Sequence, residues 1–194
     1  MFKPVSRARK FVGLTILILL ISLIAFAMFF PPGISRRSSQ HSKAKAAIHE
    51  LSEAIASFCN EQNCLPLSEG EGETKIVLTD ERLMNVISAC DQPDESPYKI
   101  GHFTYRKAKG KNGDYWDGLH QTRSTFEFFG PWRNPNIEDR YYRVIFNYGY
   151  KDAIKVSDEL GGELVKGEMF LIYHKGPDGK TGPGFNEDNV YSWK

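Results

Sequence analysis

Apolar residues form one unbroken block near the start of the chain and return downstream in periodic patterns. The block runs from residue 11 to residue 30, FVGLTILILLISLIAFAMFF, and contains no charged side chain. At about 1.5 Å of rise per residue, a helix of this length reaches about 30 Å, the thickness of the hydrocarbon core of a bilayer. Residues 11–30 are therefore predicted to form a transmembrane helix.

The next residues predict a kinked connector and then an amphipathic helix. Pro31 and Pro32 lack the backbone N–H that continues a helix, so residues 31–41 are predicted to form the connector. Over residues 42–60, apolar positions recur every three or four residues and make one narrow stripe: Ile48, Leu51, Ile55 and Phe58. This spacing predicts a helix that packs its stripe on a sheet of the same chain.

Beyond residue 74 the pattern changes to short strands separated by polar turns. Residues 75–78 predict a strand, and Asp80 is a suitable N-cap for a brief helix after it. Alternating positions predict further strands that contain residues 103–105, 126–128, 142–150, 153–156 and 169–173. An exposed loop is expected over residues 107–118, and a hairpin turn at Gly161-Gly162 between the last two strands. The chain is therefore predicted to be α+β, with three or four antiparallel strands in a small sheet.

Charge divides the 194 residues unevenly. The net charge is +1, but the first 45 residues carry eight Lys or Arg and no Asp or Glu, which leaves −7 on the remainder. A mildly acidic domain lacks the clustered basic face that binds phosphate backbones, so nucleic acid is not an expected partner. The predicted organisation is a basic cytoplasmic tail (1–10), the transmembrane helix, the connector and a soluble domain (42–194).

The N-terminal layout, a basic tail before an apolar block, is typical of an export signal. It is either retained as an anchor or cut after Ala27, where Ala25-Phe26-Ala27 has the small-x-small pattern. Four basic residues precede the block and four follow it, so the positive-inside count is a tie. The short tail and the large cysteine-bearing domain favour a cytoplasmic N-terminus with the domain outside.

Three cysteines are present, Cys59, Cys64 and Cys90, and none forms a C-x-x-C pair. Cys59 and Cys64 are the nearest candidates for a disulfide in an oxidising compartment. The alternative is that all three are small, buried or half-buried apolar side chains.

Groupings typical of an active site are missing from the sequence. His49-Glu50 lacks the second histidine of the H-E-x-x-H zinc motif, and neither a nucleophile elbow nor a phosphate-binding glycine loop occurs. The chain is therefore not predicted to be an enzyme.

The C-terminal segment has a different character, because a glycine-rich loop there carries several oxygen-bearing side chains. Asp178 lies in it, followed by Asn186, Glu187 and Asp188. Calcium takes six to eight oxygen ligands, and carboxylates with backbone carbonyls of such a loop can provide them. The alternative is a tight Pro-Asp-Gly turn beside a solvated acidic cluster.

Three features together resemble the pseudopilins of type II secretion and related type IV pilin-like proteins. The first is the order of basic tail, hydrophobic helix, amphipathic helix and small antiparallel sheet. The second is the tail, in which GPDGK, the acidic cluster and a terminal Ser-Trp are similar to the closing calcium loop of the major pseudopilin. The third is PWRNP at residues 131–135 before Tyr141-Tyr142, similar to the family's P-W-G-N-P-Y element.

The resemblance implies a pilin-like fold in which one long N-terminal helix packs on the sheet. It assigns calcium to Asp178, Glu187 and Asp188, with Asn186 as a further ligand, and makes Trp193 the aromatic plug behind the loop. It also implies a structural subunit held by a single pass in the bacterial inner membrane, with a periplasmic domain. The implied partners are membrane lipid, like subunits, other pseudopilins, an inner-membrane platform and an assembly ATPase.

The resemblance also places a processing site after Gly13, so that Leu14 becomes the first residue of an assembly helix containing Thr15. Ile18 stands where the family has a glutamate that pairs with the N-terminal amine of the neighbouring subunit. A second hypothesis is an anchored or secreted pilin-fold binding module that does not polymerise. Such a module would hold a partner or glycan with an exposed aromatic loop around Tyr115, Trp116 and Trp132.

Overall fold

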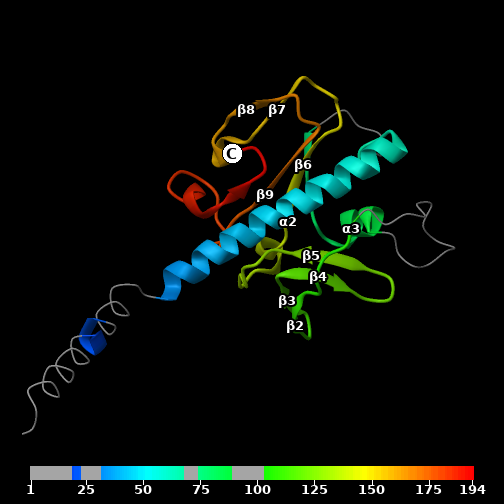
Figure 1. Cartoon of the computed structure of the whole chain (residues 1–194). Coiled ribbons are helices and arrows are strands. Elements are labelled where there is room, and N and C mark those ends of the chain that lie inside the picture. The colour runs from blue at the N-terminus through cyan, green and yellow to red at the C-terminus, as the bar shows by residue number, and fades with distance from the viewer. Residues whose placement is uncertain (1–18, 23–31, 68–73, 89–102) are drawn as a thin grey trace, which may run out of the picture. The chain divides into compact units, whose positions relative to one another are not determined.

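The structure is a computed structural model that describes four stretches of the chain: residues 19–22, 32–67, 74–88 and 103–194 (Figure 1). The chain divides into two compact units, residues 1–39 and residues 40–194. The predicted basic tail, the processing and assembly positions and one cysteine lie outside the described residues: Gly13, Leu14, Thr15, Ile18 and Cys90.

Of the predicted transmembrane block, the structure describes residues 19–22, which are helical. Leu19, Leu20 and Ile21 are exposed there. Within the described stretches, no helix combines the length and the apolarity needed to cross a bilayer. The membrane span stays a prediction.

Helix α2 runs from Pro32 to Gln62. The predicted end of the amphipathic helix is confirmed, but the connector is wrong for residues 32–41, which are helical. The physical reason lies in the position of Pro32, which is the first residue of the helix. The N–H of a first helical residue has no partner inside the helix, so a proline there costs no hydrogen bond.

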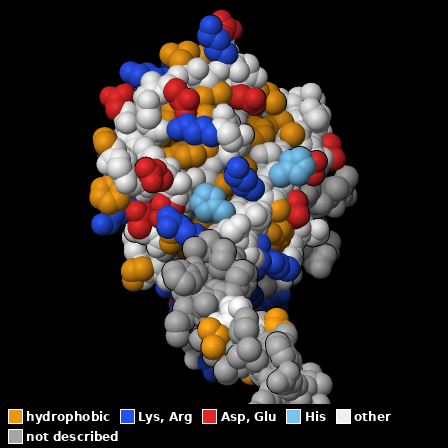
Figure 2. All heavy atoms as spheres, turned by 60° about the vertical axis from the view of Figure 1, so that its left-hand side comes forward, with side chains coloured by type: hydrophobic (Ala, Val, Ile, Leu, Met, Phe, Trp, Pro, Cys, Tyr) orange, Lys and Arg blue, Asp and Glu red, His pale blue; other side chains and the backbone are white. Residues whose placement is uncertain are grey.

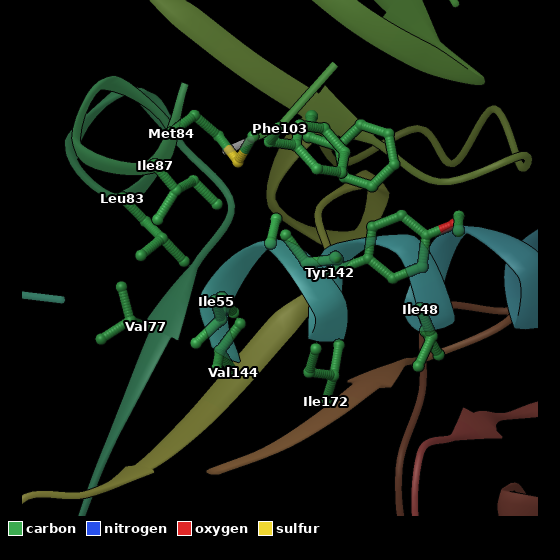
Figure 3. Packing of buried hydrophobic residues seen from close by; sticks show 14 of the residues in the cluster. Ile48, Ile55, Val77, Leu83, Met84, Ile87, Phe103, Tyr142, Val144 and Ile172 are labelled. Atoms are coloured by element: carbon green, nitrogen blue, oxygen red, sulfur yellow. The ribbon is translucent and has the colours of Figure 1, made fainter. Parts of the chain in front are cut away.

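The predicted apolar stripe of α2 is buried against the sheet (Figure 3). Ile48, Leu51, Ile55 and Phe58 share one core cluster with the β-strand side chains Val144, Phe146 and Ile172. Alanines widen the stripe and let the helix approach closely: Ala44, Ala47 and Ala54 are also buried in this cluster. The packing of an amphipathic helix on a small antiparallel sheet is therefore confirmed.

The sheet has four antiparallel strands in the order β1-β6-β9-β10. Their bounds are Thr74–Leu78, Arg143–Asn147, Phe170–His174 and Val190–Tyr191. Val144 pairs with Ile172 and Ile145 with Leu171. Because successive side chains point to opposite faces, the first pair meets α2 and the second pair enters another cluster.

That second cluster covers the face of the sheet opposite α2. It contains Ile145, Leu171 and Tyr173 from the sheet together with Ile154 and Leu160 from the segment that follows β6. Strand β6 is therefore covered on both faces, which explains why each of its residues is buried, whereas the edge strand β1 leaves Ile76 exposed.

Short paired strands and one helix complete the domain. Helix α3 (Glu81–Ile87) starts at the predicted cap, because the Asp80 carboxylate accepts a hydrogen bond from Arg82 N at 3.1 Å. Three strand pairs flank the main sheet: β2–β3 (Lys109–Lys111, Asp114–Trp116), β4–β5 (Gly118–Gln121, Phe126–Phe129) and β7–β8 (Ala153–Lys155, Leu164–Lys166).

Two turn predictions need correction. The expected exposed loop over residues 107–118 contains the β2–β3 hairpin, which reverses at Asn112 and Gly113, both at positive φ. Gly161-Gly162 does lie in a hairpin, but its strands are β7 and β8. Residues 169–173, the expected partner, belong almost entirely to β9 and pair with β6, because their apolar side chains cover both faces of the main sheet.

Candidate functional site

The C-terminal loop, residues 175–189, connects the last two strands of the main sheet and begins beside a buried histidine. His174 ends β9 and is fully buried. Its Nδ1 accepts a hydrogen bond from Gly176 N at 3.0 Å, and its Nε2 lies 3.2 Å from Arg140 O. A carbonyl oxygen only accepts and an amide N–H only donates, so the ring is neutral with its proton on Nε2. Burial lowers the pKa of His174 to about 3, which keeps the ring neutral.

The PWRNP segment holds the same loop from the other side. Asn134 is buried, and its Nδ2 donates to Asp139 O at 2.9 Å and to Gly176 O at 3.1 Å. Trp132 packs its ring against His174, with 4.9 Å between the centroids. The two motifs that carry the family resemblance are therefore in contact with each other.

The predicted calcium side chains are not gathered around one point. Asp178 is exposed, and its Oδ1 accepts a hydrogen bond from Lys180 N at 3.0 Å, which makes a tight turn. Glu187 is exposed, whereas Asp188 is half-buried and its backbone oxygen lies 2.9 Å from His41 Nε2 of α2. Among the residues described, no three Asp, Glu, His or Cys side chains come together to hold a metal.

Asn186 has a structural role within the loop. Its Oδ1 accepts hydrogen bonds from Gly182 N at 3.3 Å and from Asn189 Nδ2 at 2.9 Å. Its Nδ2 donates to Glu159 O at 2.9 Å. The Asn186 oxygen faces hydrogen-bond donors and its nitrogen faces an acceptor, so the orientation of the amide is fixed.

The oxygens that do converge in the loop belong to Asn189 and two backbone carbonyls. In one orientation of the Asn189 amide, its Nδ2 donates to Asn186 Oδ1 and Tyr191 Oη. The side-chain oxygen of Asn189 then faces Lys175 O at 2.6 Å and Lys180 O at 3.3 Å. Turning the amide satisfies both carbonyls but sets the Asn189 oxygen against Asn186 Oδ1 at 2.9 Å. The turned orientation of this buried side chain pairs donors with acceptors, because the Asn189 oxygen then also accepts from Tyr191 Oη at 3.1 Å, and it leaves the contact with Asn186 Oδ1 unpaired.

A cation bound at this point would also separate the facing oxygens. Lys175 O, Lys180 O and Asn189 Oδ1 are the uncharged oxygen donors that calcium accepts, and an ion bound to them leaves the Asn189 nitrogen free to donate to Asn186. A calcium ion at this point would be held by these three atoms and would need further oxygens to reach six to eight ligands, and the assignment to Asp178, Asn186, Glu187 and Asp188 stays a prediction. Backbone carbonyls carry no sequence signature, whereas the buried Asn189 could have been found from its place just before the last strand.

Two predicted aromatic features differ from expectation. Trp193 packs on Tyr191 and Tyr173, and its Nε1 donates to Glu163 Oε1 at 2.6 Å. It therefore contacts the second core cluster and the β7–β8 hairpin. Trp132 was expected in an exposed aromatic loop, but it is only 3% exposed. Its ring also contacts the ring of His41 in α2, edge to face.

The remaining two aromatic residues of the expected binding loop are half-buried and are packed against side chains of the domain. The Tyr115 ring stacks on His120 with centroids 3.8 Å apart, and the Arg133 guanidinium lies 4.8 Å from the centre of the Trp116 ring. Figure 2 shows one face of the molecule, on which positive, negative and apolar side chains are interspersed.

Cys59 and Cys64 are both free thiols, so the predicted bridge between them is not formed in the structure and stays a prediction. They line a pocket of about 180 Å³ with Met169 and Tyr150. Burial, with a contribution from neighbouring Cys64, raises the pKa of Cys59 to about 11. Its thiol therefore stays protonated near neutral pH, which makes it a poor nucleophile.

Comparison of the chain with protein-family models, with curated proteins and with solved structures gave no match.

Proposed function

We propose that this protein is a pseudopilin-like structural subunit of a type II secretion or type IV pilus-like apparatus. The observation that carries the proposal is the contact between the PWRNP segment and the C-terminal loop through Asn134 and Gly176. These are the two specific motifs of the family resemblance, and each was recognised separately in the sequence. Their contact beside an amphipathic helix on a small antiparallel sheet supports a pilin-like fold.

In this proposal residues 11–30 hold the chain in the bacterial inner membrane with the N-terminus in the cytoplasm and the domain in the periplasm. The same helix then packs against like subunits and other pseudopilins, with an ATPase and a membrane platform supplying the work. Lipid tails are as apolar as the helix, so specificity has to come from packing and polar contacts. The function is non-covalent and needs no catalytic residue.

Calcium has a structural part in the proposal. Lys175 O, Lys180 O and Asn189 Oδ1 would hold it, and Asp178, Glu187 and Asp188 would add negative charge to the same loop. Bound calcium supplies positive charge that orders the loop on the sheet.

Self-association of the membrane helix tests the proposed function. The full chain, with a photoreactive amino acid at Leu20, is expressed in bacterial inner membranes and irradiated. We expect a ladder of self-crosslinked species, because subunits packed through this helix make an open series of contacts. The same reactive group at exposed Leu164 is the matched control for random collision. A strictly monomeric product at both positions would contradict the proposal and favour the non-polymerising binding module.

A further inference from the structure

One flank of α2 borders a pocket that carries positive charge. The pocket has a volume of about 190 Å³ and is lined by Lys45, Ile48, His49, Ser52, Tyr191, Ser192 and Lys194. Lys45 is exposed and, among the described residues, has no carboxylate within 4.0 Å, whereas Lys194 Nζ is 3.3 Å from Glu163 Oε1. Ser192 Oγ accepts a hydrogen bond from Ile172 N, which leaves its own hydrogen to donate. These groups suit a carboxylate.

The other flank of the exposed face of α2 carries an acidic side chain. An α-helix turns about 100° per residue, so Glu50, five residues after Lys45, projects about 140° away from it. Glu50 is exposed. Glu53 lies between the two flanks and is 3.4 Å from His49 Nε2. One helix therefore presents a receptor for a carboxylate on one flank and an exposed carboxylate on the other.

We propose that Glu50 of one copy of this chain docks in the Lys45–His49–Lys194 pocket of a second, parallel copy. The inference rests on the proposed function, because copies anchored in one membrane lie parallel. Two parallel helices side by side bring opposite flanks together, which sets the pocket of one against Glu50 of the next. The contact uses two different surfaces, so it can repeat from copy to copy, and it forms an open series when the rotation between copies does not close a ring.

The charges on α2 also favour an axial displacement between the two parallel helices. Lys43 lies on the same flank as Glu50, about 160° from Lys45. In register, Lys45 of one copy would meet Lys43 of the other, and like charges repel. Displacing one copy by about five residues, or about 8 Å along the helix, replaces Lys43 by Glu50.

Photocrosslinking of the full chain in membranes tests the contact. A photoreactive amino acid at His49 should attach to residues 50–57 of a second copy, as mapped by peptide mass spectrometry. Attachment of position 49 to position 49 would show antiparallel pairing, and attachment to another protein would show a different partner. Either of these results would overturn the proposal.

Charge reversal tests the pairing of the two side chains. Lys45→Glu and Glu50→Lys should each lower the self-crosslinking yield about threefold to tenfold, and the double variant should restore it to within twofold. Lys151→Glu, a reversal at an exposed lysine that does not line the pocket, is the matched control and should change nothing. Failure of the double variant to restore the yield would refute the Lys45–Glu50 contact.

The two proposals fail in distinguishable ways. A ladder from position 20 without a product from position 49 would leave the pseudopilin-like function standing and remove the α2 contact. Loss of both products would remove both proposals.

Discussion

The core beneath α2 and the C-terminal loop are held by different forces, although they lie on the same sheet. Ile48, Leu51 and Phe58 are buried by apolar packing, which is insensitive to pH and to ions. The loop is held by hydrogen bonds: His174 accepts one from Gly176, and Asn134 and Asn189 donate to Gly176 and Asn186. The stability of the apolar core should therefore change little with pH, whereas the buried His174 makes the loop responsive to protons.

Truncating the core should give the largest loss of stability. Phe58→Ala removes a ring that is 1% exposed in the main cluster and leaves a cavity. We expect a loss of about 3–5 kcal/mol in the free energy of unfolding, independent of pH between 5 and 8. Chemical denaturation of the full chain measures it, with Glu53→Ala on the exposed face of α2 as the control within about 0.5 kcal/mol. A loss below about 1 kcal/mol would show that α2 is not the main support of the sheet.

Acidification should weaken the loop by way of His174. Its pKa is about 3 in the folded protein and near 6.5 in an unfolded chain, so the unfolded state takes up the proton first as the pH falls. Stability is full above about pH 6.5 and declines below it, until the folded state is also protonated near pH 3. Between pH 7 and pH 4 we expect a loss of about 3 kcal/mol, measured by denaturation at each pH.

The matched variant for this effect is His174→Gln, whose amide does not titrate. It should lower stability at pH 7, because it disturbs the bonds to Gly176 and Arg140, but it should flatten the dependence on pH. If the wild-type and variant curves keep the same slope between pH 6.5 and pH 4, His174 is not the responsible group.

The same contrast explains how far the sequence could be interpreted. The stripe of α2, the Asp80 cap and the edges of β1 follow from periodicity and from local hydrogen bonding, and all were predictable. The connector at 31–41 was not, because a proline at Pro32 is equally compatible with a break and with a first helical turn. Local rules do not distinguish the two.

The loop was predictable in position but not in chemistry. Its glycines and acidic residues drew attention to Asp178 and Glu187, whose side chains are exposed. The converging oxygens belong to Asn189 and to the backbone of Lys175 and Lys180, and only the path of the chain brings these together. A search of the sequence for ligand side chains does not find backbone carbonyls that converge in this way.

The smallest expected effect is the one that tests this difference. Calcium at ten times its dissociation constant should stabilise the full chain by about 1.4 kcal/mol, which corresponds to a rise in Tm of about 3–6 °C. Thermal melts with calcium and with a chelator measure the shift. Asn189→Ala should abolish it, because the amide oxygen that faces Lys175 O and Lys180 O is lost. Asp178→Ala should retain most of it, since the Asp178 carboxylate is bound to Lys180 N in a turn.

The reverse result, with Asp178 essential and Asn189 dispensable, would return the site to the carboxylates predicted from sequence. If calcium does not shift the Tm of the unmodified chain, the loop does not bind calcium and is held by the hydrogen bonds of His174 and Asn134. The core beneath α2 and the C-terminal loop would then differ only in their response to pH.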